Sequence, residues 1–188
     1  MVTQQELTYR QLVTLRDGAR VLLRPLTKED RQALIDLFQT VSAEERRYMM
    51  HDVSDAQLVG SWADNIDYDK LFPMVAMVGD RMVGDATLRF REGPARHRAE
   101  IRIFLAKDFR RRGLATRITQ SLIDLAKRRG LYMLEVIIVT DRVSDIKAFQ
   151  SLGFEHVCVY SDFWMLPDGE LRDLAHMILR LRNTADEY

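Results

Sequence analysis

The sequence of 188 residues predicts a mixed α/β fold, with a largely antiparallel sheet that contains one parallel crossover. Strand-like and helix-like segments alternate along the chain, and neither repeats nor a linker interrupt them. Residues 98–139 have the pattern of a strand, a helix and a buried strand, which together make a βαβ unit with a right-handed crossover. The other strand-like segments follow one another at the short spacing of hairpins. We expect one domain over residues 1–188, with its core at about 20–181.

The first half of the chain predicts a hairpin, two helices and a second pair of strands. Asp17-Gly18 is a turn pair between two strand-like runs. Thr27, with Asp30 three residues later, resembles a capping box that starts an amphipathic helix. The expected elements are strands at 13–15 and 20–26, a helix reaching Val41, a helix after Ser54 or Asp55, and strands at 73–78 and 81–91.

The second half predicts the crossover and a closing pair of strands. Residues 131–139 are almost continuously apolar, which is typical of a strand buried on both faces. Gly130 stands where the preceding helix needs its C-terminal cap. The expected elements are a strand at 98–105, a helix at about 113–129, a strand at 131–139, a short helix capped by Ser144 or Asp145 and ending at 152–154, and strands at 156–160 and 174–181.

The charges and the single cysteine limit the binding partners and the cellular compartment that we expect for the protein. The 28 basic and 28 acidic residues cancel, so no overall field draws the chain to nucleic acid or to a membrane surface. No apolar run reaches the roughly 20 residues that span a bilayer, and the N-terminus lacks the apolar core of a signal peptide. Cys158 excludes an internal disulfide and favours a reducing compartment. We expect a cytoplasmic protein without a metal site, because its histidines lack metal-ligand spacing.

Three arginines stand at the start of the long predicted helix. Arg110, Arg111 and Arg112 precede Gly113, and their charge opposes the helix dipole, whose positive end lies there. The first N–H groups of a helix have no acceptor within the helix, and a glycine lets an anion approach them closely. A bound polyanion would relieve the repulsion, so the segment predicts a phosphate site at the carboxyl end of a strand. An ordinary solvated basic loop is the alternative.

The same segment carries a family resemblance. Residues 110–115, RRRGLA, fit the pattern R/Q-x-x-G-x-G/A of the GNAT N-acetyltransferases. RVLLRPLTKED at 20–30 resembles the family's opening strand and helix, and LGF at 152–154 resembles the end of its last helix. DGELRDLAHMILRL at 168–181 resembles a closing strand of small bacterial members. With SAEERRYMM at 42–50, the chain is also similar to bacterial protein-lysine acetyltransferase domains.

The resemblance implies an acetyltransferase that uses acetyl-coenzyme A as co-substrate. It implies that two central strands splay into a slot for the pantetheine arm, and that the loop amides hold the pyrophosphate. A hydroxyl or amide of Thr116 is expected to reach a phosphate. The implied coenzyme-binding residues are Ile103, Phe104, Leu105, Arg110, Arg111, Arg112, Gly113, Leu114, Ala115 and Thr116.

The chemistry of acetyl transfer to an amine calls for a general base. A lysine-like amine is almost entirely protonated at neutral pH, so a base must help to supply the neutral nucleophile. Ala99-Glu100-Ile101 resembles the stretch that carries this base in histone-type acetyltransferases, which makes Glu100 the candidate. A solvated glutamate on a polar strand face is the alternative for Glu100, and Glu135 is the second candidate for the base. The acceptor is expected to be a primary amine, either a small molecule or a protein lysine.

One departure from the family pattern concerns the acid that protonates the leaving thiolate. Phe149 occupies the position where many members carry a tyrosine, and Tyr160 or Tyr132 would have to replace it unless the thiolate leaves unassisted. The departure supports an alternative function, a non-catalytic module that binds or senses acyl-CoA. A nucleic-acid binder is disfavoured by the zero net charge. The sequence leaves the assembly open, a homodimer included.

Overall fold

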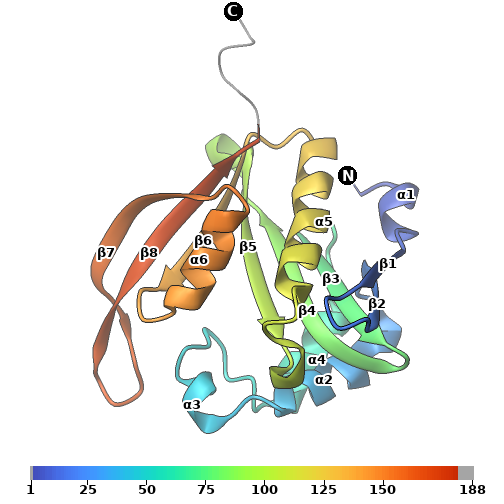
Figure 1. Cartoon of the computed structure of the whole chain (residues 1–188), viewed down its shortest axis with the longest axis horizontal. Helices are drawn as coiled ribbons and strands as arrows, with labels where there is room; N and C mark the ends of the chain where they lie inside the picture. The colour runs from blue at the N-terminus through green and yellow to red at the C-terminus, as the bar shows by residue number, and fades with distance from the viewer. Residues whose placement is uncertain (1, 182–188) are drawn as a thin grey trace, which may run out of the picture. The chain divides into compact units, whose positions relative to one another are not determined.

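The protein has a mixed α/β fold in the computed structural model, which describes residues 2–181 (Figure 1). Eight strands form one sheet in the order β1-β2-β3-β4-β5-β6-β8-β7. β5 and β6 run parallel, whereas β1·β2, β2·β3, β3·β4, β6·β8 and β7·β8 are antiparallel. This arrangement confirms the predicted fold class and its single parallel pair.

The chain divides into two compact units, which are described one at a time. Unit 1 comprises the residues up to Arg89 together with Arg102–Leu122, and unit 2 comprises Phe90–Ile101 and the residues from Ile123 onward. Three elements pass from one unit into the other, namely β4 (Arg81–Phe90) by its last residue, β5 (Arg98–Leu105) and α5 (Leu114–Arg128). A single domain over residues 1–188 stays a prediction, and residues 1 and 182–188 lie outside the described part.

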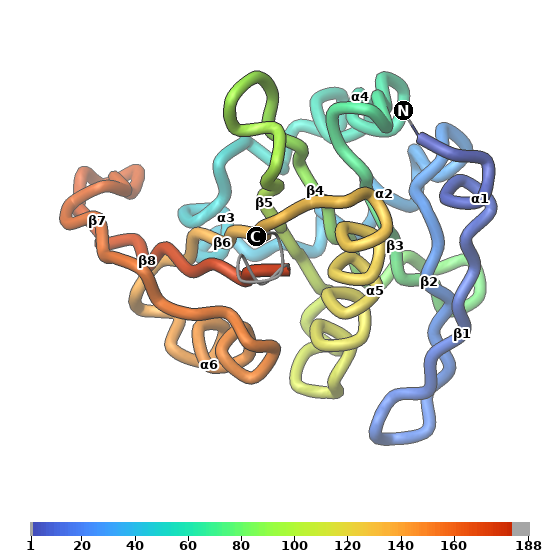
Figure 2. Tube along the Cα trace, turned by 90° about the horizontal axis from the view of Figure 1, so that it is seen from above, coloured from blue at the N-terminus to red at the C-terminus, as the bar shows by residue number. Residues whose placement is uncertain are grey.

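Unit 1 contains the first four strands and the first four helices. In Figures 1 and 2, α2 and α4 lie on one face of its strands, and the first part of α5 lies on the other face. The elements are α1 (Gln4–Leu7), β1 (Gln11–Thr14), β2 (Arg20–Pro25), α2 (Arg31–Gln39), α3 (Ala43–Arg46), α4 (Ala56–Asp64), β3 (Leu71–Val78) and β4 (Arg81–Phe90).

Turn and cap residues place these elements as the sequence predicts. Gly18 has a left-handed φ of +85°, and Asp17 accepts the N–H of Ala19 at 3.1 Å, which closes the β1–β2 hairpin. The N–H of Thr27 donates to Asp30 Oδ2 at 2.8 Å just before α2. Asp55 caps α4 by accepting the N–H groups of residues 57 and 58. These local bonds confirm the predicted hairpin and both helix starts.

Unit 2 contains the second half of the crossover and the closing hairpin. Its elements are β6 (Met133–Val139), α6 (Val143–Ser151), β7 (Glu155–Met165) and β8 (Leu171–Arg180). Three parallel pairs join β5 to β6, namely Arg98↔Met133, Ala99↔Leu134 and Glu100↔Glu135. Gly130 has a φ of +71° at the end of α5, which confirms the predicted cap.

Several boundaries differ from the expectation. α1 and α3 are absent from the sequence prediction because four residues show no helical periodicity, although each has a capping box. α6 begins at Val143 and not behind Ser144 or Asp145, since the N–H groups of residues 145 and 146 bond to the Arg142 carbonyl. β7 continues past residue 160 to Met165 through an irregular register that includes Asp162 at a φ of +55°.

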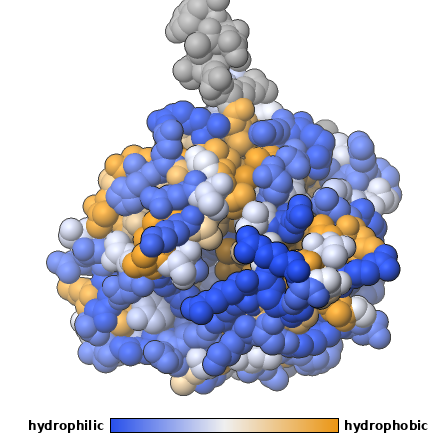
Figure 3. Space-filling model, viewed as in Figure 1, coloured by the Kyte–Doolittle hydropathy of each residue, from blue (hydrophilic) through white to orange (hydrophobic). Residues whose placement is uncertain are grey.

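The surface seen in Figure 3 is mostly hydrophilic, with apolar side chains scattered between charged ones. On β7 the side chains of Val157, Phe163 and Met165 are exposed, with 66% of Phe163 accessible to solvent. Over residues 2–181, the helices are all too short or too polar to cross a membrane.

Candidate functional site

The loop between β5 and α5 in unit 1 turns its backbone through left-handed conformations. Arg111 has a φ of +59° and Gly113 a φ of +89°, and α5 begins at Leu114. Turns of this kind direct successive N–H groups toward one side and make a concavity that binds anions. The first helical N–H groups follow directly, and they have no acceptors within the helix. The backbone therefore has the form expected of a phosphate site.

The open space at Gly113 is consistent with a phosphate-binding loop. A Cβ built on Gly113 would have Arg16 Nε as its nearest neighbour, at 3.8 Å. A phosphate can thus approach the backbone here without displacing a packed group. Leu114 is fully buried and anchors the helix start, while Ala115 is half-buried and Thr116 is exposed in the first turn. The residues present fit a phosphate-bearing co-substrate.

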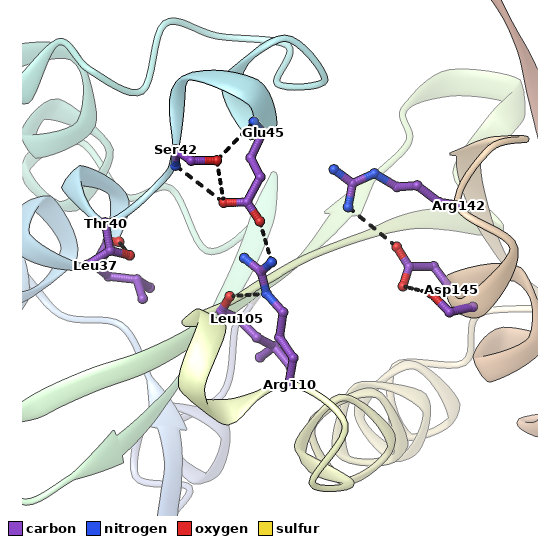
Figure 4. A network of polar contacts seen from close by, with 9 residues as sticks. Leu37, Thr40, Ser42, Glu45, Leu105, Arg110, Arg142 and Asp145 are labelled. Atoms are coloured by element: carbon purple, nitrogen blue, oxygen red, sulfur yellow. Dashed lines mark hydrogen bonds and ion pairs between the residues drawn. The ribbon is translucent and has the colours of Figure 1, made fainter.

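Arg110 is held by unit 1 itself. Its Nε donates to the carbonyl of Leu105 at 3.0 Å, and its guanidinium forms an ion pair with Glu45 (Figure 4). The guanidinium also lies 5.6 Å from the ring centre of Phe104. Burial alone would raise the pKa of Glu45, but the hydrogen bonds from Arg110 and Ser42 and the charge of Arg110 together outweigh it, and the pKa lies below the ordinary value. Glu45 also bonds to Ser42 in the capping box of α3. Arg110 therefore links the loop to α3.

Arg112 also has bonding partners within unit 1, whereas Arg111 is exposed to solvent. Arg112 forms an ion pair with Asp17 of the β1–β2 turn and donates to the carbonyl of Asp108 at 3.0 Å. The hydrogen bond from Arg112 lowers the pKa of Asp17. Arg111 is exposed and has no ion-pair partner among residues 2–181. Of the three arginines, Arg111 is therefore the one whose guanidinium can form an ion pair with a ligand without first leaving an acidic side chain.

The strand that leads into this loop packs closely against β4. Leu105 is buried, and Ile103 and Phe104 are half-buried. A Cβ on Gly84 of β4 would come within 2.6 Å of Leu105 Cδ2, so any larger residue at this position would have to displace the Leu105 side chain. The end of β5, where the pantetheine arm is expected, is thus fixed by a small residue on its neighbour.

Two buried glutamates face each other in unit 2. Glu100 and Glu135 are register partners on β5 and β6, and they are 6% and 3% exposed. Arg91 bridges them, with its Nη2 at 3.0 Å from Glu100 Oε2 and 2.8 Å from Glu135 Oε1. Two like charges this close to one another require a shared cation, which Arg91 supplies. The solvated strand face considered for Glu100 is therefore wrong.

Glu135 has two further basic neighbours, an arginine and a histidine. Arg98 Nη1 lies 3.5 Å and His176 Nε2 lies 3.3 Å from Glu135 Oε2. The other ring nitrogen of His176, Nδ1, lies 3.3 Å from the hydroxyl of Tyr160. The surroundings of Glu135 are those of a carboxylate fixed in an ionic network.

Phe149 and the two tyrosines considered as substitutes for the thiolate acid each have their own neighbours within unit 2. Phe149 is 8% exposed and packs edge-on against Phe154, with ring centres 5.1 Å apart. The ring centre of Tyr132 lies 6.4 Å from that of His97. A hydrogen bond with Cys158 raises the pKa of Tyr160, which keeps this phenol protonated at neutral pH.

The sequence reading missed one acidic residue of unit 1 as well as the basic partners of the glutamates. Asp85 lies half-buried in the middle of β4, and burial raises the pKa of its carboxyl to about 7. The signal that could have drawn attention to it is a lone charged residue among the uncharged residues MVGDATL at 82–88. No group of three or more potential metal ligands occurs within residues 2–181.

The loop at the start of α5 has the backbone form of a site for a phosphate-bearing ligand. The model of the acetyltransferase (GNAT) family matches residues 31–154, more than half of the chain, and the protein belongs to this family. It is accordingly an acyl-CoA-dependent acetyltransferase with acetyl-CoA as co-substrate. The expected family resemblance is confirmed.

Solved structures show the same fold at low sequence identity. The GNAT domain of PAT from S. lividans is 17% identical, with 96% of this chain and 99% of that chain covered and a TM-score of 0.77. A putative acetyltransferase from Salmonella typhimurium, solved with its cofactor acetyl-CoA, is 20% identical over 88% and 96% of the two chains, with a TM-score of 0.73. The ribosomal-protein-alanine N-acetyltransferase of Brucella melitensis is 22% identical over 84% and 98%, with a TM-score of 0.72.

Proposed function

We propose that the protein is an N-acetyltransferase that acetylates a primary amine, with Glu100 as the general base. The observation that carries the proposal is a buried carboxylate on β5, the strand that leads into the phosphate loop. Glu100 is bonded through one oxygen to Arg91, which holds the side chain in place. Glu100 lies on β5 itself, whereas Glu135 lies on the neighbouring strand β6, and this favours Glu100 over Glu135 as the residue that accepts a proton.

The reaction transfers one acetyl group and one proton. The amine nitrogen attacks the thioester carbonyl carbon, the new N–C bond forms and the C–S bond breaks. Glu100, directly or through one water, takes the proton that the nitrogen loses, and coenzyme A departs as its thiol after a proton is returned to the sulfur. Backbone N–H groups of β5 stabilise the oxyanion that develops on the carbonyl oxygen.

The loop before α5 holds the pyrophosphate of the co-substrate in this proposal. Backbone amides at residues 111–116 serve as donors, with Arg111 as the side chain whose charge is free to pair with phosphate. Arg110 and Arg112 fix the loop through Glu45 and Asp17. Backbone groups of Ile103, Phe104 and Leu105 bind the pantetheine arm, as the family resemblance implies.

The acceptor is a small amine or a protein lysine. The names of similar structures include a ribosomal-protein-alanine N-acetyltransferase and a PAT domain, and these support an amine acceptor without selecting one. We also propose a cytoplasmic location, which the single unpaired cysteine supports.

Replacing Glu100 by glutamine tests the base. Glu100→Gln should keep coenzyme A binding and lose about 10²–10⁴-fold in turnover at neutral pH, the usual contribution of a positioned general base. The loss should shrink as the pH approaches the pKa of the acceptor amine, because neutral amine then forms without help. Turnover is read from thiol release with a panel of amines and lysine peptides.

The matched control is Glu155→Gln, which removes a carboxylate from the exposed ion pair with Arg180 in the same unit. This variant should retain wild-type turnover. Near-normal turnover of Glu100→Gln at neutral pH would show that Glu100 is not the general base. A defect of constant size at all pH values would mean that Glu100 positions the acceptor instead.

A further inference from the structure

Arg16 of the β1–β2 hairpin lies against the loop before α5, and both segments belong to unit 1. Arg16 Nε lies 3.8 Å and Arg16 Cγ 3.9 Å from the position that a Cβ on Gly113 would take. Apart from the chain neighbours of Gly113, no other heavy atom of residues 2–181 lies within 4 Å of that position. The Arg16 side chain therefore borders the open space through which a phosphate would approach the loop.

The backbone of the hairpin is fixed to the loop at this point. The N–H of Arg16 donates to the carbonyl of Arg112 at 3.5 Å, and the next residue, Asp17, forms an ion pair with the Arg112 guanidinium. On the other side of Arg16, the N–H of the buried Leu15 donates to the carbonyl of Ala19 at 2.9 Å. Only the side chain of Arg16 would have to be ordered when a ligand binds, which keeps the entropic cost of binding low.

The guanidinium of Arg16 has no acidic partner within residues 2–181 and is exposed. The adjacent acid, Asp17, is bound to Arg112, and the hydrogen bond from Arg112 lowers the pKa of Asp17. Its carboxylate therefore stays charged and holds the loop, and it is not available to Arg16. The acid of the hairpin fixes the loop, while the base of the hairpin is left with its charge unpaired.

Two guanidinium groups at the loop are thus unpaired, those of Arg16 and Arg111, and they come from different segments of the chain. Positive charges gathered without an acid repel one another, and a bound anion relieves this repulsion. A guanidinium donates in pairs to phosphate oxygens, so phosphate is the anion that it suits best. Acetyl-CoA carries phosphate in its pyrophosphate and on its ribose.

We propose that Arg16 is a binding residue for acetyl-CoA, and that its guanidinium donates to a phosphate group of the co-substrate in the open space at Gly113. The inference rests on the proposed function, because it takes the loop before α5 as the phosphate site. The β1–β2 hairpin then contributes a side chain to this site in addition to the loop amides and Arg111. Arg16 thereby increases the preference for a thioester with phosphate groups over the same thioester without them.

Calorimetric titration with coenzyme A tests the proposal without turnover. Arg16→Ala should weaken the binding of coenzyme A about 5–20-fold, the effect of losing a charge-assisted hydrogen bond at an exposed site. Arg16→Lys should recover part of the affinity, because it keeps the charge and loses the paired donors. The difference between wild type and Arg16→Ala should shrink as salt is added, since salt screens an exposed ion pair. A loss that does not depend on salt would mean that Arg16 only supports the fold of the loop, and it would overturn the proposal.

The matched control is Arg20→Ala on the same hairpin. Arg20 is also exposed and unpaired within residues 2–181, but none of its atoms lies within 4 Å of the Cβ position at Gly113. This variant should bind coenzyme A as wild type does. Dephospho-coenzyme A, which keeps the pyrophosphate and lacks the ribose phosphate, identifies the phosphate that Arg16 contacts. An undiminished effect of Arg16→Ala on this ligand assigns Arg16 to the pyrophosphate, and a vanished effect assigns it to the ribose phosphate.

Kinetics supply the second readout. Arg16→Ala should raise KM for acetyl-CoA more than it lowers kcat, because the phosphates lie far from the reacting carbon. Unchanged affinity for coenzyme A in a folded Arg16→Ala protein would overturn the proposal, as would an equal loss in Arg20→Ala. Gly113→Glu distinguishes this failure from a failure of the proposed function. If only the assignment of Arg16 is wrong, Gly113→Glu still loses coenzyme A, whereas normal binding by Gly113→Glu would refute the loop itself as the phosphate site.

Discussion

At the scale of single residues, the buried carboxylates of this protein differ in how they are compensated. Glu100 and Glu135 share Arg91, with distances of 3.0 and 2.8 Å, and both glutamates are almost completely buried. Asp85 has no such partner within residues 2–181, and the pKa of its carboxyl is raised to about 7. The uncompensated carboxyl of Asp85 opposes folding whenever it is ionised, because burial removes its water without giving it a partner.

The stability of Asp85→Asn should therefore depend on pH. The pKa of Asp85 is about 7 in the folded protein and 3.8 ordinarily, so the folded state binds its proton more tightly. The carboxyl then costs stability progressively as the pH rises from about 4 to about 7, and the full cost is present above that range. Asp85→Asn should raise the free energy of unfolding by ~1–3 kcal/mol at about pH 8 and change it little below about pH 4. Urea unfolding at both pH values checks this, and a destabilised variant at the higher pH would contradict it.

Removal of Arg91 should affect stability and catalysis together. Arg91→Ala leaves two facing glutamates without their shared cation, which should cost about 2–4 kcal/mol because the guanidinium is itself partly exposed. Arg91→Lys should recover only part of this, since one ammonium cannot reproduce the geometry of the guanidinium. Denaturant unfolding and thiol-release kinetics measure both effects. A variant of wild-type stability would show that the glutamates find another partner.

At the scale of elements, the loop before α5 depends on backbone conformation more than on its arginine side chains. Two of the three arginines are bonded within unit 1, to Glu45 and Asp17, and stabilise the loop. The left-handed turns at Arg111 and Gly113 place the amides that a phosphate would meet. The basic character of the segment is thus mainly structural, with Arg111 as the exception.

Gly113→Glu should abolish coenzyme A binding, because a side chain and a negative charge would enter the space that a phosphate needs. Gly169→Glu is the matched control, since Gly169 has a nearly equal φ of +86°, lies in open space and belongs to the β7–β8 turn of unit 2. Both variants carry the strain of a non-glycine residue at positive φ, so the comparison isolates the local effect. Calorimetric titration should show a loss of more than about 100-fold for Gly113→Glu alone, and equal losses in both variants would place the phosphate elsewhere.

At the scale of the whole molecule, the net charge of zero leaves binding to depend on local sites. Coenzyme A should therefore act as a specific ligand of the native state and raise the melting temperature. At ~100 times Kd the stabilisation is about 2.7 kcal/mol, which corresponds to a shift of about 5–10 °C for a chain of this size. Adenosine, which lacks the pyrophosphate, should have little effect. A melting temperature insensitive to coenzyme A would exclude the proposed loop as its binding site.

The sequence by itself determined the order and type of nearly all the long elements. Alternation of apolar and polar residues defines β4, and the predicted β5 at 98–105 coincides with the observed strand. The capping pair at Thr27 and Asp30 and the glycines at turns fix the boundaries through local bonds, which depend only on neighbours in the chain. The family resemblance rests on such local segments as well, and the family model confirms it.

Only the tertiary structure decided how the charged side chains are paired. Arg110 and Glu45 lie 65 positions apart, and Arg91 and Glu135 lie 44 apart, so periodicity contains no information about either pair. The isolation of Asp85 was equally hidden, because the absence of a partner depends on every strand and helix packed around it. Pairing and desolvation arise from contacts between distant segments, and these contacts exist only once the sheet has brought the segments together.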